Sequence, residues 1–209
     1  TSVTASAEAA IWDGTEDTAW YYREHDVIVS ENGERIAIFN IRTAEELAGL
    51  AKLVRNGNNM KNTMINLVSD VTLNDTTNFD NWDEQPPANN WTAIGAVPIE
   101  APNVNVVMTI QPECRNTVFA GMFNGNGHTI SGMYSLHHNY AGLFARTSGI
   151  ITNVIVKDSY IQCINTQKVE SGDTALWEAC AGGITAICDR GVISHCEFDG
   201  KIFASGLNQ

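Results

Sequence analysis

The stretches that decide the fold are AGLF at 141–144 with GIITNV at 149–154, and AGGI at 181–184 with GVISHC at 191–196. Each pair has a small residue, glycine and apolar residues, then a short gap, then Gly-x-Ile and alternating apolar positions. The two copies are about 40 residues apart, and a unit of that size buries its apolar face only by stacking on a neighbour. The repetition therefore predicts a solenoid.

Composition bounds the class of protein before any motif is considered. The chain has 209 residues, of which 44% are hydrophobic and 17% charged, with 17 glycines. This length supports one sizeable core, and short segments rich in Val, Ile, Thr and Asn favour β structure. The net charge of −12 argues against binding to nucleic acid phosphates or anionic lipid. No apolar stretch reaches the roughly 18–20 residues of a membrane span, so we expect no membrane insertion.

The N-terminus and the cysteines bear on the compartment. Residues 1–10 are small, polar and Ala-rich, which predicts a flexible tail at the start of a mature secreted chain, with a plain cytosolic tail as the alternative. The chain has five cysteines, an odd number, so they cannot all pair within it. Apolar residues surround Cys163, Cys188 and Cys196, and we expect these three to be buried free thiols rather than parts of a disulfide framework.

One convincing helix is predicted at 43–56. Thr43 and Glu46 form a capping box, and Gly57 suits the left-handed position after the helix. Between them Leu47, Leu50, Ala51 and Val54 form one apolar stripe. We expect this helix to cover the open end of the first solenoid layer, with an independent partner-binding helix as the alternative.

The remaining segments are predicted as strands and loops. Asn32-Gly33 separates two strand-like runs and predicts a type I′ hairpin turn. Strands are expected at 63–73, near 91–94, near 104–110, and repeatedly from residue 119 onward. The polar segment at 74–90 is predicted to be a long loop, and 111–116 a second loop.

These elements suggest three parts. They are a tail at 1–10, an N-terminal cap at 11–62 that contains the helix, and a solenoid at 63–209 that contains the long loop.

The stretch FAGMFNGNGHTISG at 119–132 resembles the segment that introduces the bacterial GLUG-repeat proteins. AGLF at 141–144 is similar to the GLUG motif itself, and AGGI at 181–184 to a degenerate copy. TAEELAGLA at 43–51 and WTAIG at 91–95 also resemble segments that precede such repeats. With gaps, the resemblance covers residues 40–205.

The resemblance implies an all-β fold, a right-handed parallel β-helix with an N-terminal cap that contains one amphipathic α-helix. It also implies a secreted or cell-surface bacterial protein of the adhesin type. The motif is not catalytic in that family, and its glycines shape the turns between layers. In this chain those glycines are Gly121, Gly125, Gly127, Gly142, Gly182 and Gly183.

The long loop holds the candidate ligand-binding residues. Asp75, Asp80 and Asp83 could contribute hard oxygen ligands to calcium, although their spacing matches no EF-hand loop, and a solvated polar loop is the better interpretation. Trp82 has polar neighbours and is the aromatic side chain expected to be exposed. Trp12, Trp20 and Trp91 are expected instead to pack between the cap and the first layer.

Candidates for catalysis or zinc binding are weak. Paired carboxylates would have to come from Asp158, Asp189, Glu197 and Asp199, and the three aspartates stand at apparent turns. His128 belongs to the family's turn, and His137-His138 has no partner at ligand spacing. The set of Cys188, His195 and Cys196 is not a zinc signature.

The sequence thus predicts a non-enzymatic protein acting in adhesion, display or structural assembly, without cofactor or metal. Its partner would be another copy stacked end to end, possibly in a filament, or a glycan or protein on a host or bacterial surface. The alternative is a carbohydrate-active β-helix enzyme of the polysaccharide lyase or glycosidase type.

Overall fold

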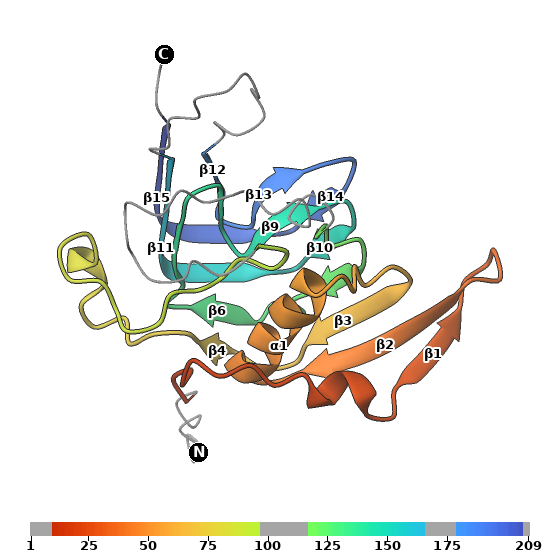
Figure 1. The fold of residues 1–209 in the computed structure, drawn as a ribbon. Coiled ribbons are helices and arrows are strands. Elements are labelled where there is room, and N and C mark those ends of the chain that lie inside the picture. The colour runs from red at the N-terminus through yellow and green to blue at the C-terminus, as the bar shows by residue number, and fades with distance from the viewer. Residues whose placement is uncertain (1–9, 97–116, 166–178, 207–209) are drawn as a thin grey trace.

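The computed structural model describes residues 10–96, 117–165 and 179–206 (Figure 1). In these ranges the chain forms parallel sheets around a core to which one α-helix, α1 (Ala44–Arg55), contributes. Two short 3₁₀ helices, η1 (Ala19–Tyr22) and η2 (Phe79–Asn81), lie outside the sheets.

The largest sheet has six strands in the order β1-β2-β3-β5-β10-β14. These are β1 (Asp26–Val29), β2 (Arg35–Ile41), β3 (Thr63–Leu67), β5 (Met122–Asn124), β10 (Ile150–Thr152) and β14 (Val192–Ser194). Only β1 and β2 are antiparallel; the other neighbours are parallel. The two copies of the sequence repeat lie side by side here, with Ile150 opposite Val192 and Thr152 opposite Ser194.

A second sheet has the order β15-β11-β6-β4, and β7 also pairs with β11. Its strands are β4 (Val71–Thr72), β6 (Thr129–Ser131), β7 (Tyr134–His137), β11 (Ile155–Asn165) and β15 (Glu197–Gly206). Two small parallel pairs complete the structure: β8 (Tyr140–Ala141) with β12 (Cys180–Ala181), and β9 (Phe144–Thr147) with β13 (Thr185–Cys188). Parallel in-register pairing brings like positions of successive segments into columns.

One such column forms the centre of the core. It consists of Phe39, Ile65, Phe123, Ile151 and Ile193, one residue from each parallel strand of the large sheet. The first four side chains are buried, and their neighbours along each strand face outward, as the period of two requires. The core therefore runs perpendicular to the strands, from β2 towards β14.

The helix α1 packs into this core and forms where the capping box predicts. The Thr43 hydroxyl accepts a hydrogen bond from the Glu46 backbone N–H at 3.2 Å, and Gly57 has φ +97° after the helix. Nine of the twelve helical residues are buried, more than the single predicted stripe. Gly49 makes this possible, because a Cβ atom there would lie 1.8 Å from the backbone oxygen of Asp17.

The fold class predicted from the sequence, an all-β right-handed parallel β-helix, is wrong. The chain is a mixed α/β structure with parallel sheets, one antiparallel strand pair and a helix in the core. The prediction placed the helix in a cap at the end of a solenoid over 63–209, whereas α1 shares the main hydrophobic core with the sheet strands. The boundary predicted at residue 62 stays a prediction, although the six-stranded sheet has strands on both sides of it.

Two local predictions also differ from the structure. The β1–β2 hairpin exists, but among its turn residues only Gly33 has a positive φ, so the turn is not type I′. The strand expected near 91–94 is reduced to one bridge between Ile94 and Phe144. Residues 1–9, the strand near 104–110, the loop at 111–116 and Cys114 lie outside the described residues.

Candidate functional site: the end layer of the two sheets

The described chain exposes large apolar side chains at the last strands of both sheets, and two of them, Ile193 and Ile202, continue core columns. We call the four residues Val192, Ile193, Ile202 and Phe203 the end layer; they belong to β14 and β15. Ile151 is 0% exposed, whereas Ile193, the next residue of the same column, is 40% exposed. In the second sheet Ile161 is 0% exposed and its neighbour Ile202 is 43% exposed. Core columns that are closed elsewhere thus end at solvent.

The strands of the end layer also have free edges. β14 and β15 are the terminal strands of their sheets, so on one side each has no strand partner among the described residues. Val192 donates its backbone N–H to the backbone oxygen of Gly149, just before β10, at 2.9 Å, which leaves the N–H and C=O of Ile193 directed to the free side. An edge with unpaired backbone groups beside exposed apolar side chains is a template for another strand.

The predicted ligand-binding loop at 74–90 lies elsewhere, against the outer face of the second sheet. Its Trp82 was expected to be exposed, and that prediction is wrong, because the side chain is 2% exposed. The indole packs edge-to-face on Tyr134 at 6.1 Å between ring centroids, and Tyr134 stacks on Tyr160 at 5.6 Å. The prediction relied on the polar neighbours of Trp82 in the sequence, whereas the tyrosines that cover it belong to the distant strands β7 and β11. Trp82 thereby fixes the loop to the sheet.

The three acidic candidates of this loop have separate roles. The Asp75 carboxylate accepts hydrogen bonds from the hydroxyl and the backbone N–H of Thr77, which lower its pKa. Asp80 is exposed, and its carboxylate lies 3.8 Å from the Lys201 ammonium of β15. Asp83 is exposed near Tyr160, whose pKa is raised first by burial and further by that carboxylate.

Within the described ranges, no group of three or more His, Cys, Asp or Glu side chains is arranged to hold a metal ion. Calcium binding by the loop stays an untested hypothesis.

Two of the candidate catalytic acids, Asp158 and Asp189, hold positions in local structure. Asp158 stands at a left-handed position, φ +46°, where the pairing of β11 with β15 shifts register. Asp189 accepts a hydrogen bond from Arg146 at 2.8 Å, and this bond, with the charge of Arg190, lowers its pKa. Both are engaged in local structure, as turn aspartates usually are.

The described cysteines are free, but they are not equally buried. Cys163 is fully buried, which raises its thiol pKa to about 12, and Cys196 is half-buried. Cys188 is exposed, so the prediction that it is a core residue is wrong. Among the strands that the structure describes, its strand β13 pairs with β9 alone, and none of them covers its other side.

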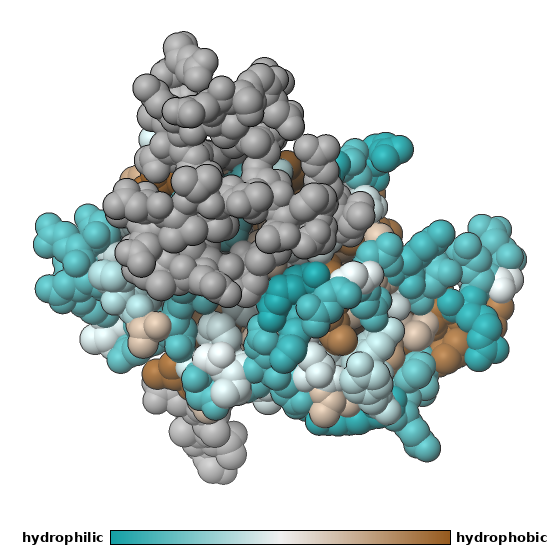
Figure 2. Space-filling model, in the orientation of Figure 1, coloured by the Kyte–Doolittle hydropathy of each residue, from teal (hydrophilic) through white to brown (hydrophobic). Residues whose placement is uncertain are grey.

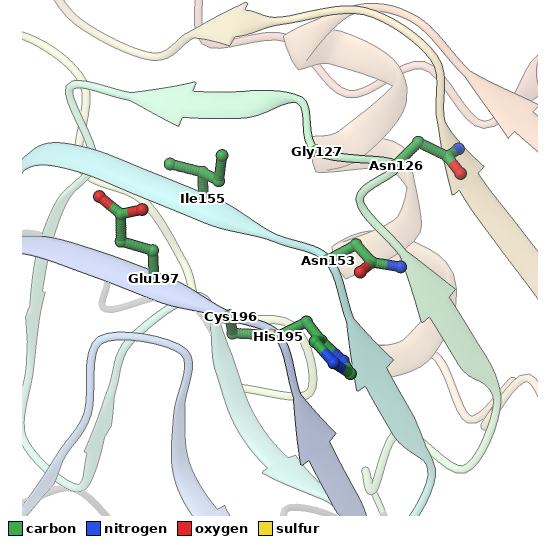
Figure 3. Close-up of a pocket in the computed structure, with 7 residues that line it drawn as sticks. All are labelled: Asn126, Gly127, Asn153, Ile155, His195, Cys196 and Glu197. Carbon is green, nitrogen blue, oxygen red and sulfur yellow. The ribbon is translucent and has the colours of Figure 1, made fainter.

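A shallow depression of about 550 Å³ lies beside the end layer, where the turns after β5, β10 and β14 stack (Figure 3). Asn126, Asn153 and His195 occupy the left-handed positions of these turns, with φ between 51° and 54°. Asn153 donates its side-chain amide to Asn124 at 3.1 Å. Figure 3 shows the Glu197 side chain directed away from the His195 ring, so the two do not form an acid–base pair. We interpret these stacked turns as structural.

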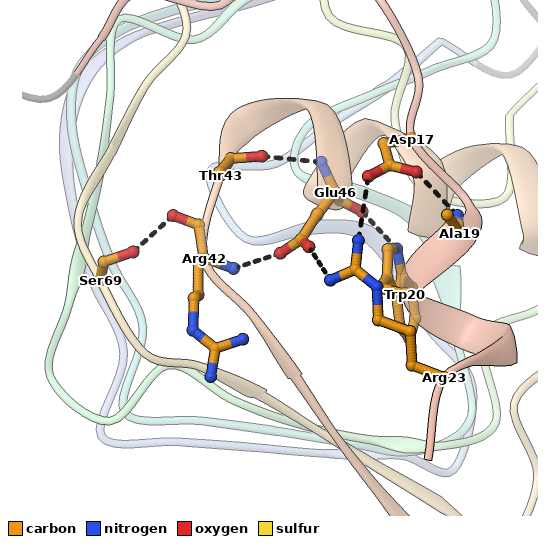
Figure 4. Close-up of polar contacts among 8 residues, drawn as sticks. All are labelled: Asp17, Ala19, Trp20, Arg23, Arg42, Thr43, Glu46 and Ser69. Carbon is orange, nitrogen blue, oxygen red and sulfur yellow. Dashed lines mark hydrogen bonds and ion pairs between the residues drawn. The ribbon is translucent and has the colours of Figure 1, made fainter. Parts of the chain in front are cut away.

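A second cluster of charges, beside the start of α1, is also structural (Figure 4). The buried Glu46 carboxylate accepts hydrogen bonds from the Arg42 backbone N–H at 2.7 Å and the Arg23 guanidinium at 3.1 Å. Trp20 donates its indole N–H to the Glu46 backbone oxygen. The carboxylate thus reaches back one residue further than the capping box predicts, and Glu46 joins the helix to η1 through its backbone oxygen and to Arg23, the residue after η1, through its carboxylate. Its partners compensate its burial.

Most glycines of the resemblance lie where another segment passes closely: a backbone at Gly121, Gly125, Gly142 and Gly182, and the Phe198 ring at Gly183. At five of the six a Cβ atom would lie within 2.5 Å of another residue's atom, these being Gly121, Gly125, Gly142, Gly182 and Gly183. Gly127 instead has φ +76°.

Taken together, the described residues form a mixed α/β chain whose two sheets end in edge strands with exposed apolar side chains. No known protein family, curated protein or solved structure matches it. The resemblance to GLUG-repeat proteins therefore stays a hypothesis that rests on the residues quoted above. None of the helices described is long and apolar enough to cross a membrane.

Proposed function

We propose that this chain is a non-enzymatic secreted or cell-surface protein that acts in adhesion, display or structural assembly, and that it binds its partner through the end layer. The observation that carries the proposal is the change along the core columns, from fully buried Ile151 and Ile161 to Ile193 and Ile202, which are two-fifths exposed. Exposed apolar surface of this kind marks interaction sites in soluble proteins.

The bound form that this edge favours is an added strand. The free backbone groups of Ile193 can exchange hydrogen bonds with an extended segment, while the apolar side chains at alternate positions of that segment continue the core. Such binding depends on main-chain hydrogen bonds and a repeating pattern, and needs no catalytic group. The GLUG resemblance agrees with this kind of role at a cell surface.

A labelled strand peptide tests the proposal. The probe is a short peptide of alternating threonine and valine or isoleucine, measured by fluorescence anisotropy, with a proline-containing peptide of the same composition as the control. We expect saturable binding to the wild-type chain and at least a tenfold loss in Ile193→Pro, which removes the free N–H from an edge strand.

Matched variants keep this experiment decisive. Val192→Lys serves as a second edge variant, because its exposed side chain can change without disturbing the core. Ile150→Lys, on the outer face of the interior strand β10, is the control and should bind as the wild type does. Equal binding by all four chains would overturn the proposal. So would release of reducing ends or unsaturated sugars from a panel of polysaccharides, which would indicate the enzyme alternative.

A further inference from the structure

The exposed large apolar side chains gather at the two opposite ends of the sheets. Of the ten such residues in the described ranges, nine lie at an end: Ile11, Tyr22, Val27, Ile28 and Val29 at one, and Val192, Ile193, Ile202 and Phe203 at the other. Only Ile150 lies on a strand between them. Figure 2 shows hydrophobic surface where β1 lies in Figure 1. The six-stranded sheet therefore has an apolar edge strand at each end, β1 and β14.

The backbone of β1 is arranged like that of β14. Ser30 donates its N–H to Glu34 across the hairpin, so by strand alternation Asp26 and Ile28 face β2 and Val27 directs its N–H and C=O to the free edge. Val27 also lies opposite Ala37, which packs against the core, so its side chain is on the inner face. Ile193 combines the same two properties, a free backbone and an inner side chain.

These properties permit a specific antiparallel pair. If Val27 of one copy lies opposite Ile193 of another, their free N–H and C=O groups form a hydrogen-bonded pair and both side chains continue the core. In that register Ile28 lies opposite Val192, and both are exposed, outward-facing apolar residues. Because β1 is antiparallel to every other strand of its sheet, this pairing keeps the parallel strands of successive copies in the same direction.

The charges beside β1 distinguish this pairing from a pairing of two β1 strands. Residues 24–34 contain Glu24, Asp26, Glu31 and Glu34 and no Lys or Arg. Pairing β1 with a second β1 would bring these acids together, and like charges across strands are destabilising. β14 follows the exposed Arg190 and precedes His195. In the register given above Arg190 lies opposite Ser30, one residue from Glu31, and Asp189, which lies opposite Glu31, is already paired with Arg146 and Arg190.

We propose that the partner at the end layer is a second copy of this chain, joined head to tail, with β1 of one copy added antiparallel to β14 of the next. The proposal rests on the proposed function and names its partner. The contact is heterologous, so repeated addition gives an open fibre or a closed ring. The second sheet is consistent with this arrangement, because Ile11 beside β4 at one end and Ile202 and Phe203 at the other are also exposed.

Two edge-blocked variants test the inference when mixed. Val27→Pro blocks β1 and leaves β14 free, whereas Ile193→Pro blocks β14 and leaves β1 free. By light scattering over a concentration series, the wild-type chain should grow beyond a dimer and each variant alone should stay monomeric. An equimolar mixture should stop at a heterodimer, because only one compatible pair of edges remains.

Other outcomes overturn the inference. A dimer of Val27→Pro alone would show that β14 pairs with itself, and a monomeric wild-type chain at every concentration would leave the edge to a different partner or segment. Ile28→Asp and Val192→Asp repeat the design with exposed side chains, in case a proline variant fails to fold by circular dichroism. Strand-peptide binding that persists while the wild type stays monomeric would overturn self-association and leave the proposed function standing.

Discussion

Two isoleucines in one column offer a direct measurement of how open the end layer is in solution. Ile151 and Ile193 are opposite each other on β10 and β14, yet they are 0% and 40% exposed. The substitution to alanine removes the same three carbon groups from each. At about 0.8 kcal/mol per buried group, the transfer term for Ile151 is about 2.4 kcal/mol. The cavity left inside the core adds to this, so Ile151→Ala should lower the free energy of unfolding by about 3–4 kcal/mol.

The same arithmetic gives a smaller loss of unfolding free energy for Ile193→Ala. Three-fifths of its side chain is buried, which reduces the transfer term to about 1.4 kcal/mol, and a site open to solvent adds no enclosed cavity. Ile193→Ala should therefore lower the free energy of unfolding by about 1–1.5 kcal/mol, less than half the effect of Ile151→Ala. Both effects should appear as shifts of the urea midpoint with little change in slope.

Urea unfolding is measured at a protein concentration where light scattering finds only monomer. Equal losses for the two variants would refute the reasoning, since they would mean that Ile193 is as enclosed as Ile151. A rise of the Ile193→Ala loss with protein concentration would instead indicate that a second copy buries this residue, because binding to the folded state adds to apparent stability.

Three further outcomes follow from the packing. Gly49→Ala should destabilise the fold by about 3 kcal/mol in urea unfolding, despite alanine's higher helix propensity, because its Cβ atom would collide with the Asp17 backbone; a gain in stability would contradict that contact. Trp82→Ala should lose about 3 kcal/mol and open the segment 74–90 to limited proteolysis, and an unchanged cleavage pattern would show that the indole does not hold the loop. Iodoacetamide at pH 8 should alkylate the exposed Cys188 well before Cys163, which is buried with a thiol pKa of about 12; mass spectrometry after digestion gives the order, and early labelling of Cys163 would contradict its burial.

Predictions from the sequence succeeded where a few neighbouring residues determine the local conformation. The Thr43 cap and the Gly57 terminus of α1 depend on hydrogen bonds and backbone angles within one turn. The repeat also brought Gly149–Val154 beside Gly191–Cys196 in the expected register, because identical spacing of apolar positions leaves one alignment that buries them.

The failures concern contacts between distant segments. The polar neighbours of Trp82 indicate an exposed loop, but Tyr134 and Tyr160, about fifty and eighty residues further on, form the surface that buries it. The all-β class failed for the same reason. A predicted amphipathic helix becomes a core element only when other segments cover its remaining faces, and spacing within the helix does not encode those contacts.

The end layer could be predicted as an unpaired edge but not as an exposed one, and the distinction matters for function. Soluble proteins usually protect edge strands with lysine, proline, a bulge or a covering loop. At the start of the second sheet such cover exists, because Trp12 donates its backbone N–H to the backbone oxygen of Thr72 on β4. β14, with the sequence Val-Ile-Ser, contains none of the protective residues, and half of the Val192 side chain is exposed. An apolar edge left without these protections is what a strand-adding contact requires, and the acidic flanks of β1 disfavour the pairing of two β1 edges.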